Sequence, residues 1–332
     1  LLLRHGAVAI EVVSLGLFSA GLLLLATANL PLGVAASLLI GLGYGLQNPA
    51  SSQILHKACP PEKRSLVFSI KQAGVPVGAV VASLVLPQLD ATIGWRTGLA
   101  LAAVVPLMLA IHMLRAHAHD PHDYQRGPSL LSGVLHEQKL VWNSGALRVL
   151  SALGLLYSAA QLSLSAFVVL MLVENKGWSL VAAAAVGGAL QACGAVGRVC
   201  WGSLADRRGS GFGILAFIGA ASTAGLCALP WLDGLPLPAQ IALLCALGFC
   251  LSGWNGVVMG ELAGFSPPGQ TGRVTGGALV YTFIGVMLGP SGYALIYEVA
   301  GRYDTTFAII SIATAIGALA SGVAAWRMHR TR

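Results

Sequence analysis

Two cationic side chains, those of Lys71 and Arg198, lie inside long runs of apolar residues. A cation in a membrane-spanning helix costs about 2.5–3.5 kcal/mol on insertion scales, so such a residue usually faces a bundle interior or an aqueous cavity. At a rise of about 1.5 Å per residue, each lies about 10 Å inside its run, counted from the same side of the membrane. Both could bind one anion, and a guanidinium fork matches a carboxylate bidentately. The alternative is that both side chains extend to the polar interface.

Four further polar residues inside the apolar runs are candidate ligands for the same anion: Gln72, Asn48, Asn255 and Tyr281. Their amide and hydroxyl groups can donate hydrogen bonds to a bound molecule. The alternative is that they link helices to one another, at about 0.6 kcal/mol for each hydrogen bond, or pack against neighbouring side chains.

Two acids, Glu11 and Glu261, stand clearly inside apolar runs. Either could carry a coupling proton if burial raised the pKa of its carboxyl group. Because both lie near the ends of their runs, we expect contacts with helix ends or loops instead.

The chain offers little for catalysis. A hydrolase needs a nucleophile beside a base, and a metalloenzyme needs clustered ligands. The sequence has no His-x-x-x-His pair, no Gly-x-Ser-x-Gly elbow and no nucleotide-binding loop. The histidines around His117 and His122 could suggest a metal site, but a solvated linker is the favoured interpretation. We therefore expect no enzyme activity, no cofactor and no metal, so any work must draw on a concentration gradient.

The composition identifies the elements that must position these residues. Hydrophobic residues make up 56% of the chain and charged residues only 9%, whereas soluble domains carry about 25% charged residues. A spanning helix needs about 20 mostly apolar residues. The sequence predicts an all-α polytopic membrane protein with ten transmembrane helices, near 7–28, 31–55, 65–88, 96–114, 147–172, 179–205, 211–232, 236–263, 274–298 and 304–327.

The basic residues predict the orientation. With Arg4 in the cytoplasm, 14 of the 19 lysines and arginines lie on the cytoplasmic side and three on the other, while Lys71 and Arg198 stand inside segments. Cationic loops near helix ends are retained in the cytoplasm. Both ends are therefore expected there, and topology explains the net charge of +7 better than a nucleic-acid partner does.

One turn between two apolar runs carries a recognisable pattern, Gly-x-Leu-Ala-Asp-Arg-x-Gly, from Gly202 through Asp206 and Arg207 to Gly209. It resembles the short cytoplasmic signature of the major facilitator superfamily of secondary transporters. These four residues are predicted to act in gating. We expect Asp206 to contact either the start of a neighbouring helix, where a carboxylate is favoured, or Arg207, and so to latch the cytoplasmic gate.

An internal repeat predicts the domain organisation. Residues 4–6 correspond to 207–209, residues 45–48 to 252–255 and residues 74–78 to 285–289, with offsets of 203, 207 and 211 residues. Weakly similar parallel halves are the layout of this transporter class. The resemblance implies a major facilitator fold lacking its first two helices. The expected parts are 1–114, four helices of the N-terminal bundle, 115–146, a cytoplasmic linker, and 147–332, a six-helix C-terminal bundle.

Three shorter patterns make the resemblance finer. Arg198 followed by Gly202 is similar to the eighth helix of carboxylate-carrying members, where the arginine pairs with the substrate anion. Residues 71–78 look like the fifth helix of bacterial members related to cyanate and nitroimidazole transporters, and Trp254-Asn255-Gly256 fits the tenth helix of that group. The sequence departs from the family at Leu3, which stands where an aspartate is usual.

Glycine and proline occur at matching places in the two halves. Gly74, Gly78 and Gly289 are expected to let neighbouring helices approach closely. Pro76 and Pro290 remove backbone hydrogen bonds and predict kinks. These five residues are the expected helix-bending set.

The resemblance implies a function. We expect a monomeric transporter in a bacterial inner membrane that moves a small carboxylate-like anion by alternating access, with protons as the candidate coupling ion. The alternatives are an efflux transporter of the same fold for drugs or metabolites, and an inactive truncated remnant.

Overall fold

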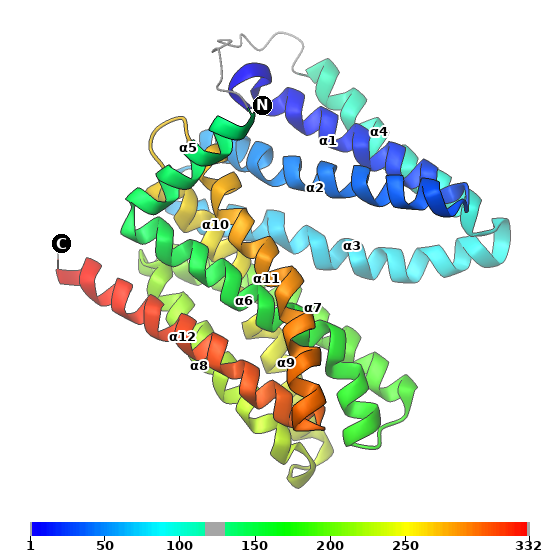
Figure 1. The fold of residues 1–332 in the computed structure, drawn as a ribbon, viewed down its shortest axis with the longest axis vertical. Helices are drawn as coiled ribbons and strands as arrows, with labels where there is room; N and C mark the ends of the chain where they lie inside the picture. The colour runs from blue at the N-terminus through cyan, green and yellow to red at the C-terminus, as the bar shows by residue number, and fades with distance from the viewer. Residues whose placement is uncertain (1, 117–129, 331–332) are drawn as a thin grey trace. The chain divides into compact units, whose positions relative to one another are not determined.

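The computed structural model describes residues 2–116 and 130–330, which are almost entirely helical (Figure 1). Two 3₁₀ turns, η1 (Pro61–Lys63) and η3 (Leu229–Gly234), and one π-helical turn, η2 (Met171–Asn175), extend or connect the α-helices. The α-helices are α1 (Leu2–Ala26), α2 (Leu30–Ala58), α3 (Arg64–Ile93), α4 (Trp95–Ala116), α5 (Leu130–Asn143), α6 (Gly145–Leu170), α7 (Leu180–Arg208), α8 (Gly211–Ala228), α9 (Leu237–Leu251), α10 (Trp254–Phe265), α11 (Thr271–Ala300) and α12 (Tyr303–Arg330).

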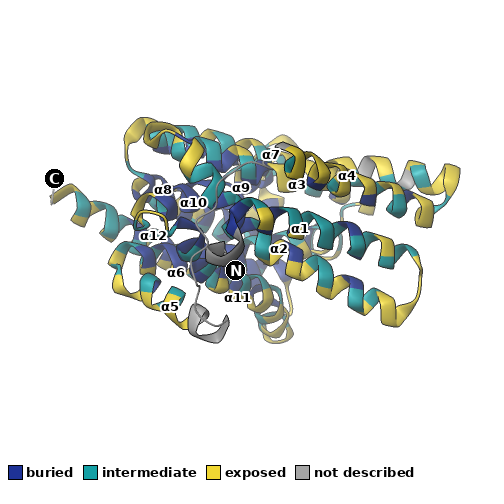
Figure 2. Ribbon diagram, turned by 90° about the horizontal axis from the view of Figure 1, so that it is seen from above, coloured by how far each residue is buried: buried dark blue, intermediate teal, exposed yellow. Residues whose placement is uncertain are grey.

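Ten spans in the described part of the chain are long and apolar enough to cross a membrane. Each has at least 21 residues, and about 20 suffice. Helices α9 and α10 together form one span, Leu237–Phe265, and α6 continues through η2 as another. Many large apolar residues are exposed, as contact with lipid requires, and exposed residues recur along the helices (Figure 2). The predicted all-α membrane architecture and its ten segments are confirmed.

Local sequence signals set several helix ends. Ser144 and Ser179 accept hydrogen bonds from the backbone N–H groups three residues later and so begin α6 and α7. Gly209 ends α7 with φ +62°, a left-handed conformation that glycine adopts without a Cβ penalty. Asn175 caps α12 from a distance, because its Oδ1 accepts the N–H of Tyr303 at 2.7 Å.

The chain forms two compact units, which we describe separately. Unit 1 comprises residues up to 58, 78–139 and 266–276. In it α1 packs against α2 and α4, and two hydroxyls of α1 fix these contacts. Ser14 donates to the carbonyl of Gly43 at 2.7 Å, and Ser19 donates to that of Ala103 at 2.8 Å.

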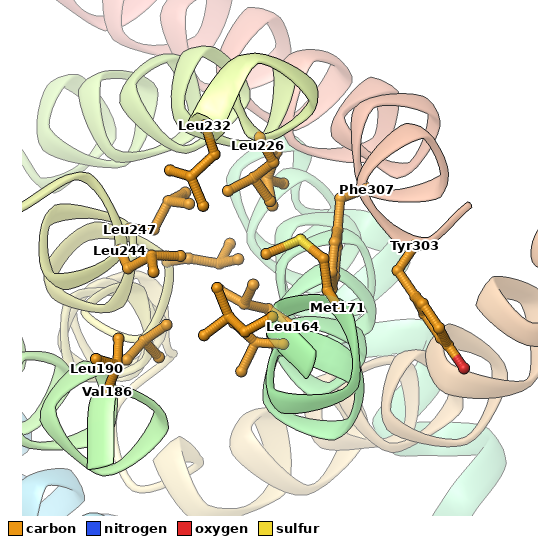
Figure 3. Close-up of a cluster of buried hydrophobic side chains, with 14 of the residues drawn as sticks. Leu164, Met171, Val186, Leu190, Leu226, Leu232, Leu244, Leu247, Tyr303 and Phe307 are labelled. Carbon is orange, nitrogen blue, oxygen red and sulfur yellow. The ribbon is translucent and has the colours of Figure 1, made fainter. Parts of the chain in front are cut away.

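Unit 2 comprises residues 59–77, 140–265 and 277–332. Its core gathers apolar side chains from α6, α7, α8, α9 and α12 (Figure 3), including Leu164, Leu190, Leu226, Leu247 and Phe307. Helix α12 runs along α8 and α6 (Figure 1).

The interval 115–146, predicted to be a linker, contains helix α5. Trp142 at the end of α5 donates from Nε1 to the hydroxyl of Tyr281 on α11 at 2.6 Å. The candidate metal ligands His117 and His122 lie outside the described residues.

Candidate functional site

The first half of α3 lies against α7 and α10 within unit 2, and we call this contact the α3 seam. Small residues make it close. A Cβ at Gly202 of α7 or at Gly256 of α10 would collide with Ser69 of α3, and a Cβ at Gly260 would lie 2.8 Å from the Cα of Ser65. Small residues four apart allow such backbone approach. The seam brings together polar side chains that are far apart in the sequence.

Asp206 binds the end of the seam at which α3 begins. Its Oδ1 accepts the backbone N–H of Ser65 at 2.9 Å, and its Oδ2 accepts that of Leu66 at 2.7 Å. Both groups belong to the first turn of α3, where N–H groups lack partners within the helix and a negative charge is favoured. The expected contact with the start of a neighbouring helix is confirmed. Arg207 is exposed in the last turn of α7.

Arg198 occupies the inner end of the seam. Of the surroundings that the sequence leaves open for this guanidinium, the structure has the bundle interior, because the residue is only 5% exposed. Its Nε donates to the carbonyl of Ser252 at 2.9 Å, and its Nη1 donates to the carbonyl of Gln72. A buried cation requires such hydrogen bonds to offset the loss of water.

The acceptor for Arg198 is available because the span 237–265 is broken. Helix α9 ends at Leu251 and α10 begins at Trp254, so the last carbonyls of α9 lack partners within the helix. Trp201, one turn from Arg198 on α7, donates from its indole to the carbonyl of Phe249 at 3.0 Å. Two side chains of α7 therefore bind the carbonyls at this break.

The structure brings together three of the six predicted anion ligands, Arg198, Gln72 and Asn255. The Gln72 amide donates to Oδ1 of Asn255 at 2.9 Å, and the backbone carbonyl of Gln72 accepts from the guanidinium of Arg198. Lys71 is half-buried and adjacent to Gln72 on α3. The other two lie elsewhere, because Asn48 is buried in α2 of unit 1 and Tyr281 contacts Trp142.

A sequence profile described as Major Facilitator Superfamily matches residues 1–290. The chain belongs to this superfamily. An uncharacterized MFS-type transporter of Mycobacterium tuberculosis is 26% identical over 238 residues, which are 71% of this chain and 52% of that protein. The 3-(3-hydroxy-phenyl)propionate transporter of Escherichia coli is 35% identical over 115 residues, 34% of this chain and 28% of that protein. The chain thus spans about half the length of the mycobacterial relative.

Solved structures agree on the fold. The fucose:proton symporter of Escherichia coli gives a TM-score of 0.74 at 18% identity, over 97% of this chain and 85% of that one. A human organic anion transporter gives 0.76 at 17% identity, over 96% and 78%. The predicted superfamily is therefore confirmed, whereas the finer resemblance to cyanate-type and carboxylate-carrying members stays a prediction.

The helix-bending set of this superfamily member divides into two groups. A Cβ at Gly289 would collide with the backbone of Ala159 on α6, so this glycine does permit a close approach. A Cβ at Gly74 or Gly78 would meet no atom within 4 Å in the described structure, and the close approach expected at these two stays a prediction. Pro76 and Pro290 lie inside the unbroken helices α3 and α11, and their kinks stay predictions.

A second cluster of charges, at the other end of unit 2, was not predicted, and we call it the outer network. The ammonium group of Lys176 lies 2.9 Å from the carboxylates of Asp233 and Asp304, and Arg302 lies 2.7 Å from Asp304. The side chains of Lys176 and Asp304 are fully buried. A signal was present in the sequence, since charges are scarce and these four stand at the ends of three apolar runs.

Proposed function

We propose that this protein is a secondary active transporter that carries a small organic anion across a membrane by alternating access. Membership of the superfamily supports transport. The observation that carries the substrate class is the buried guanidinium of Arg198 at the α3 seam, with the second cation Lys71 on the adjoining helix. One relative is named for a substrate that is an aromatic carboxylate, and one solved neighbour is described as an organic anion transporter.

Arg198 can exchange its acceptors. In the described arrangement its guanidinium donates to two neutral carbonyls, those of Ser252 and Gln72. Hydrogen bonds between two charged groups are about twice as strong as those between neutral groups, and a carboxylate matches the guanidinium fork. A substrate carboxylate would displace the carbonyl of Gln72, so anion binding would release α3 from α7.

The gating residues are proposed to act at the other end of the same seam. Asp206 holds the first turn of α3 through two backbone N–H groups. Gly202 permits the close crossing with Ser69, and Gly209 forms the turn that presents Asp206 and Arg207. Separation of α3 from α7 at both Arg198 and Asp206 would open a path for the anion to the side of the membrane that carries most of the lysines and arginines, the proposed cytoplasmic side.

Protons are the proposed coupling ion. Of the two acids inside apolar runs, Glu261 accepts the backbone N–H of Gly211 at 2.9 Å and is therefore committed to the start of α8. The helix-end contact expected for it is confirmed. Glu11 is buried in α1 of unit 1, which makes it the proposed proton carrier. We further propose a monomer in a bacterial inner membrane, with the basic ends of its helices in the cytoplasm.

The test is uptake of labelled carboxylates by proteoliposomes. Removing one partner of a buried charge pair costs about 2–5 kcal/mol, so Arg198→Ala should lower uptake at least tenfold. Arg198→Lys should restore only part of it because the fork is lost. Arg96→Ala is the control, since this arginine is exposed, and it should transport normally.

A second measurement separates anion binding from a structural role of Arg198. A carboxylate that binds the folded parent should raise its melting temperature, whereas Arg198→Ala should show no shift at the same concentration. Normal uptake by Arg198→Ala, or ligands that are all cations, would overturn the proposal.

A further inference from the structure

The ends of α6, α7 and α12 bring five arginines to one end of unit 2. We call these exposed residues the basic rim: Arg148, Arg207, Arg208, Arg327 and Arg330.

The register of α12 against α8 places part of the rim at one level. The two helices are antiparallel, since Thr223 hydrogen-bonds Thr314 at 2.7 Å and a Cβ at Gly322 would lie 4.0 Å from that of Ala216. Continuing this register puts the first residue of α8, Gly211, level with residues 326–327. Arg207 and Arg208 precede that residue by one short turn, so they lie at the level where α12 ends.

The register of α12 against α6 adds the fifth arginine. Tyr157 of α6 contacts Gly317 of α12, and Asn175 at the far end of α6 caps Tyr303, so these helices are also antiparallel. Arg148 is nine residues before Tyr157, and Trp326 is nine residues after Gly317. Arg148 is therefore level with Trp326.

Among the described residues of unit 2, carboxylates at this end are fewer than the five arginines. Among the described residues of α6, α7, α8 and α12, the carboxylate at this end is that of Asp206, which binds the backbone of α3. The neighbouring acid Glu261 of α10 binds the backbone of Gly211. Glu62 of η1, beside α7, is a third carboxylate here. Arg148, Arg207, Arg208 and Arg330 are exposed at the surface, so an anion from outside the protein can reach them.

An apolar stripe on α12 leads to the rim and indicates what kind of anion fits. Five side chains spaced four and three residues apart lie on one face of the helix, and each is at least half exposed: Ile312, Ile316, Leu319, Val323 and Trp326. Arg330 follows one turn later, with its guanidinium carbon 3.9 Å from the centre of the Trp326 ring. Tryptophan at this depth marks the boundary between acyl chains and headgroups.

We propose that the basic rim is a docking site for an anionic phospholipid. The headgroup phosphate binds Arg330 and the arginines level with it, while one acyl chain lies along the α12 stripe. A free phosphate would use the arginines alone and leave the stripe without a role, which is why the lipid is the favoured occupant.

The chain contains a matched control at the opposite end of a helix. In unit 1, Arg96 lies 5.5 Å over the ring of Trp95, and both are exposed. This pair repeats the arginine–tryptophan contact without four further arginines at its level.

The experiment measures lipid binding to the full chain, purified in uncharged detergent, by native mass spectrometry. The probes are phosphatidylglycerol and phosphatidylcholine with identical acyl chains, and glycerol phosphate as the headgroup alone. Phosphatidylglycerol should bind at least tenfold more tightly than phosphatidylcholine. Since each arginine near an anionic surface contributes about fivefold, Arg208→Gln/Arg330→Gln should lower the affinity for phosphatidylglycerol at least tenfold and leave that for phosphatidylcholine unchanged.

Two further variants keep the result interpretable. Arg208→Lys/Arg330→Lys preserves the charge and should retain most of the affinity, which shows that the glutamine variant did not merely misfold. Arg96→Gln should bind as the parent does. Equal affinity for the two lipids, or an equal loss in Arg96→Gln, would overturn the proposal. Displacement of phosphatidylglycerol by equimolar glycerol phosphate would also overturn it, because the acyl chain would then contribute nothing.

Discussion

The two ends of unit 2 hold their buried charges in different ways. The outer network consists of ion pairs, since Lys176 and Arg302 both contact the carboxylate of Asp304. In the α3 seam the charged side chains bind uncharged backbone groups, since Asp206 accepts hydrogen bonds from N–H groups and Arg198 donates to carbonyls.

This difference separates a fixed contact from an exchangeable one. Removing one member of a buried ion pair typically costs about 3–5 kcal/mol, because an uncompensated charge is left behind. A carboxylate at a helix N-terminus contributes only about 0.3–1 kcal/mol, and a backbone carbonyl can be replaced by a better acceptor. We therefore expect the outer network to hold its helices together while the seam opens and closes.

The largest expected effect comes from Asp304→Asn. This change leaves the fully buried Lys176 with Asp233 alone and removes the partner of Arg302. The free energy of unfolding, measured by denaturant titration in micelles, should fall by about 3–5 kcal/mol. Asp233→Asn is the control, since that side chain is 58% exposed, and it should cost less than about 1 kcal/mol. If the two variants were equally stable, the outer network would not be the fixed contact.

A smaller effect is expected from widening the seam with Gly256→Val. Because a Cβ there would collide with Ser69, overpacking should cost about 1–3 kcal/mol. Most of that loss should appear as separation of α3, measured as faster deuterium exchange in residues 64–72. Gly74→Val is the matched control, since a Cβ at Gly74 would meet no atom within 4 Å. Equal exchange in the two variants would mean that the glycine crossing does not hold α3.

The sequence predicts the membrane-spanning helices better than it predicts the side-chain contacts between them. Hydropathy over windows of about 20 residues finds all ten spans because lipid requires continuous apolar length. The contact of Asp206 is predictable because a carboxylate in a tight turn has few favourable partners besides a helix start. The acceptors of Arg198 are not predictable, because the carbonyl of Ser252 lies at a break between α9 and α10 that no apolar period reveals, and the carbonyl of Gln72 belongs to α3, far away in the sequence.

The outer network and the glycines both show that the sequence does not reveal which distant residues come into contact. Lys176, Asp233 and Asp304 come from places more than 50 residues apart, and only the packing of η2, η3 and α12 brings them together. Gly78 and Gly289 occupy matching positions in the repeat, yet a Cβ at Gly289 would meet a neighbouring helix and a Cβ at Gly78 would meet no atom within 4 Å. A small residue permits close approach, but the neighbour that uses it is set by tertiary structure.

The smallest effect is expected from Asp206→Asn, which removes the carboxylate at the start of α3 and should loosen α3 without unfolding the protein. The native thiol of Cys59, which lies just before α3, can report this in a background with the other five cysteines replaced by alanine. Burial raises the pKa of the Cys59 thiol above its usual value, the charge of Arg64 lowers it, and the charges of Asp206 and Glu62 raise it. Since the thiolate is the reactive form, the closed seam keeps labelling by a maleimide slow.

Opening should expose Cys59, and both opening and the loss of the Asp206 charge should lower the pKa of its thiol towards the usual value, so the labelling rate should rise. Loss of about 0.3–1 kcal/mol at the helix start corresponds to an increase of about two- to fivefold. Arg207→Gln removes one charge from the same turn but leaves the carboxylate of Asp206 in place, and its labelling rate should match that of the parent. If Asp206→Asn labels no faster than Arg207→Gln, the carboxylate does not hold the seam closed, and the contrast with the outer network must rest on Arg198 alone.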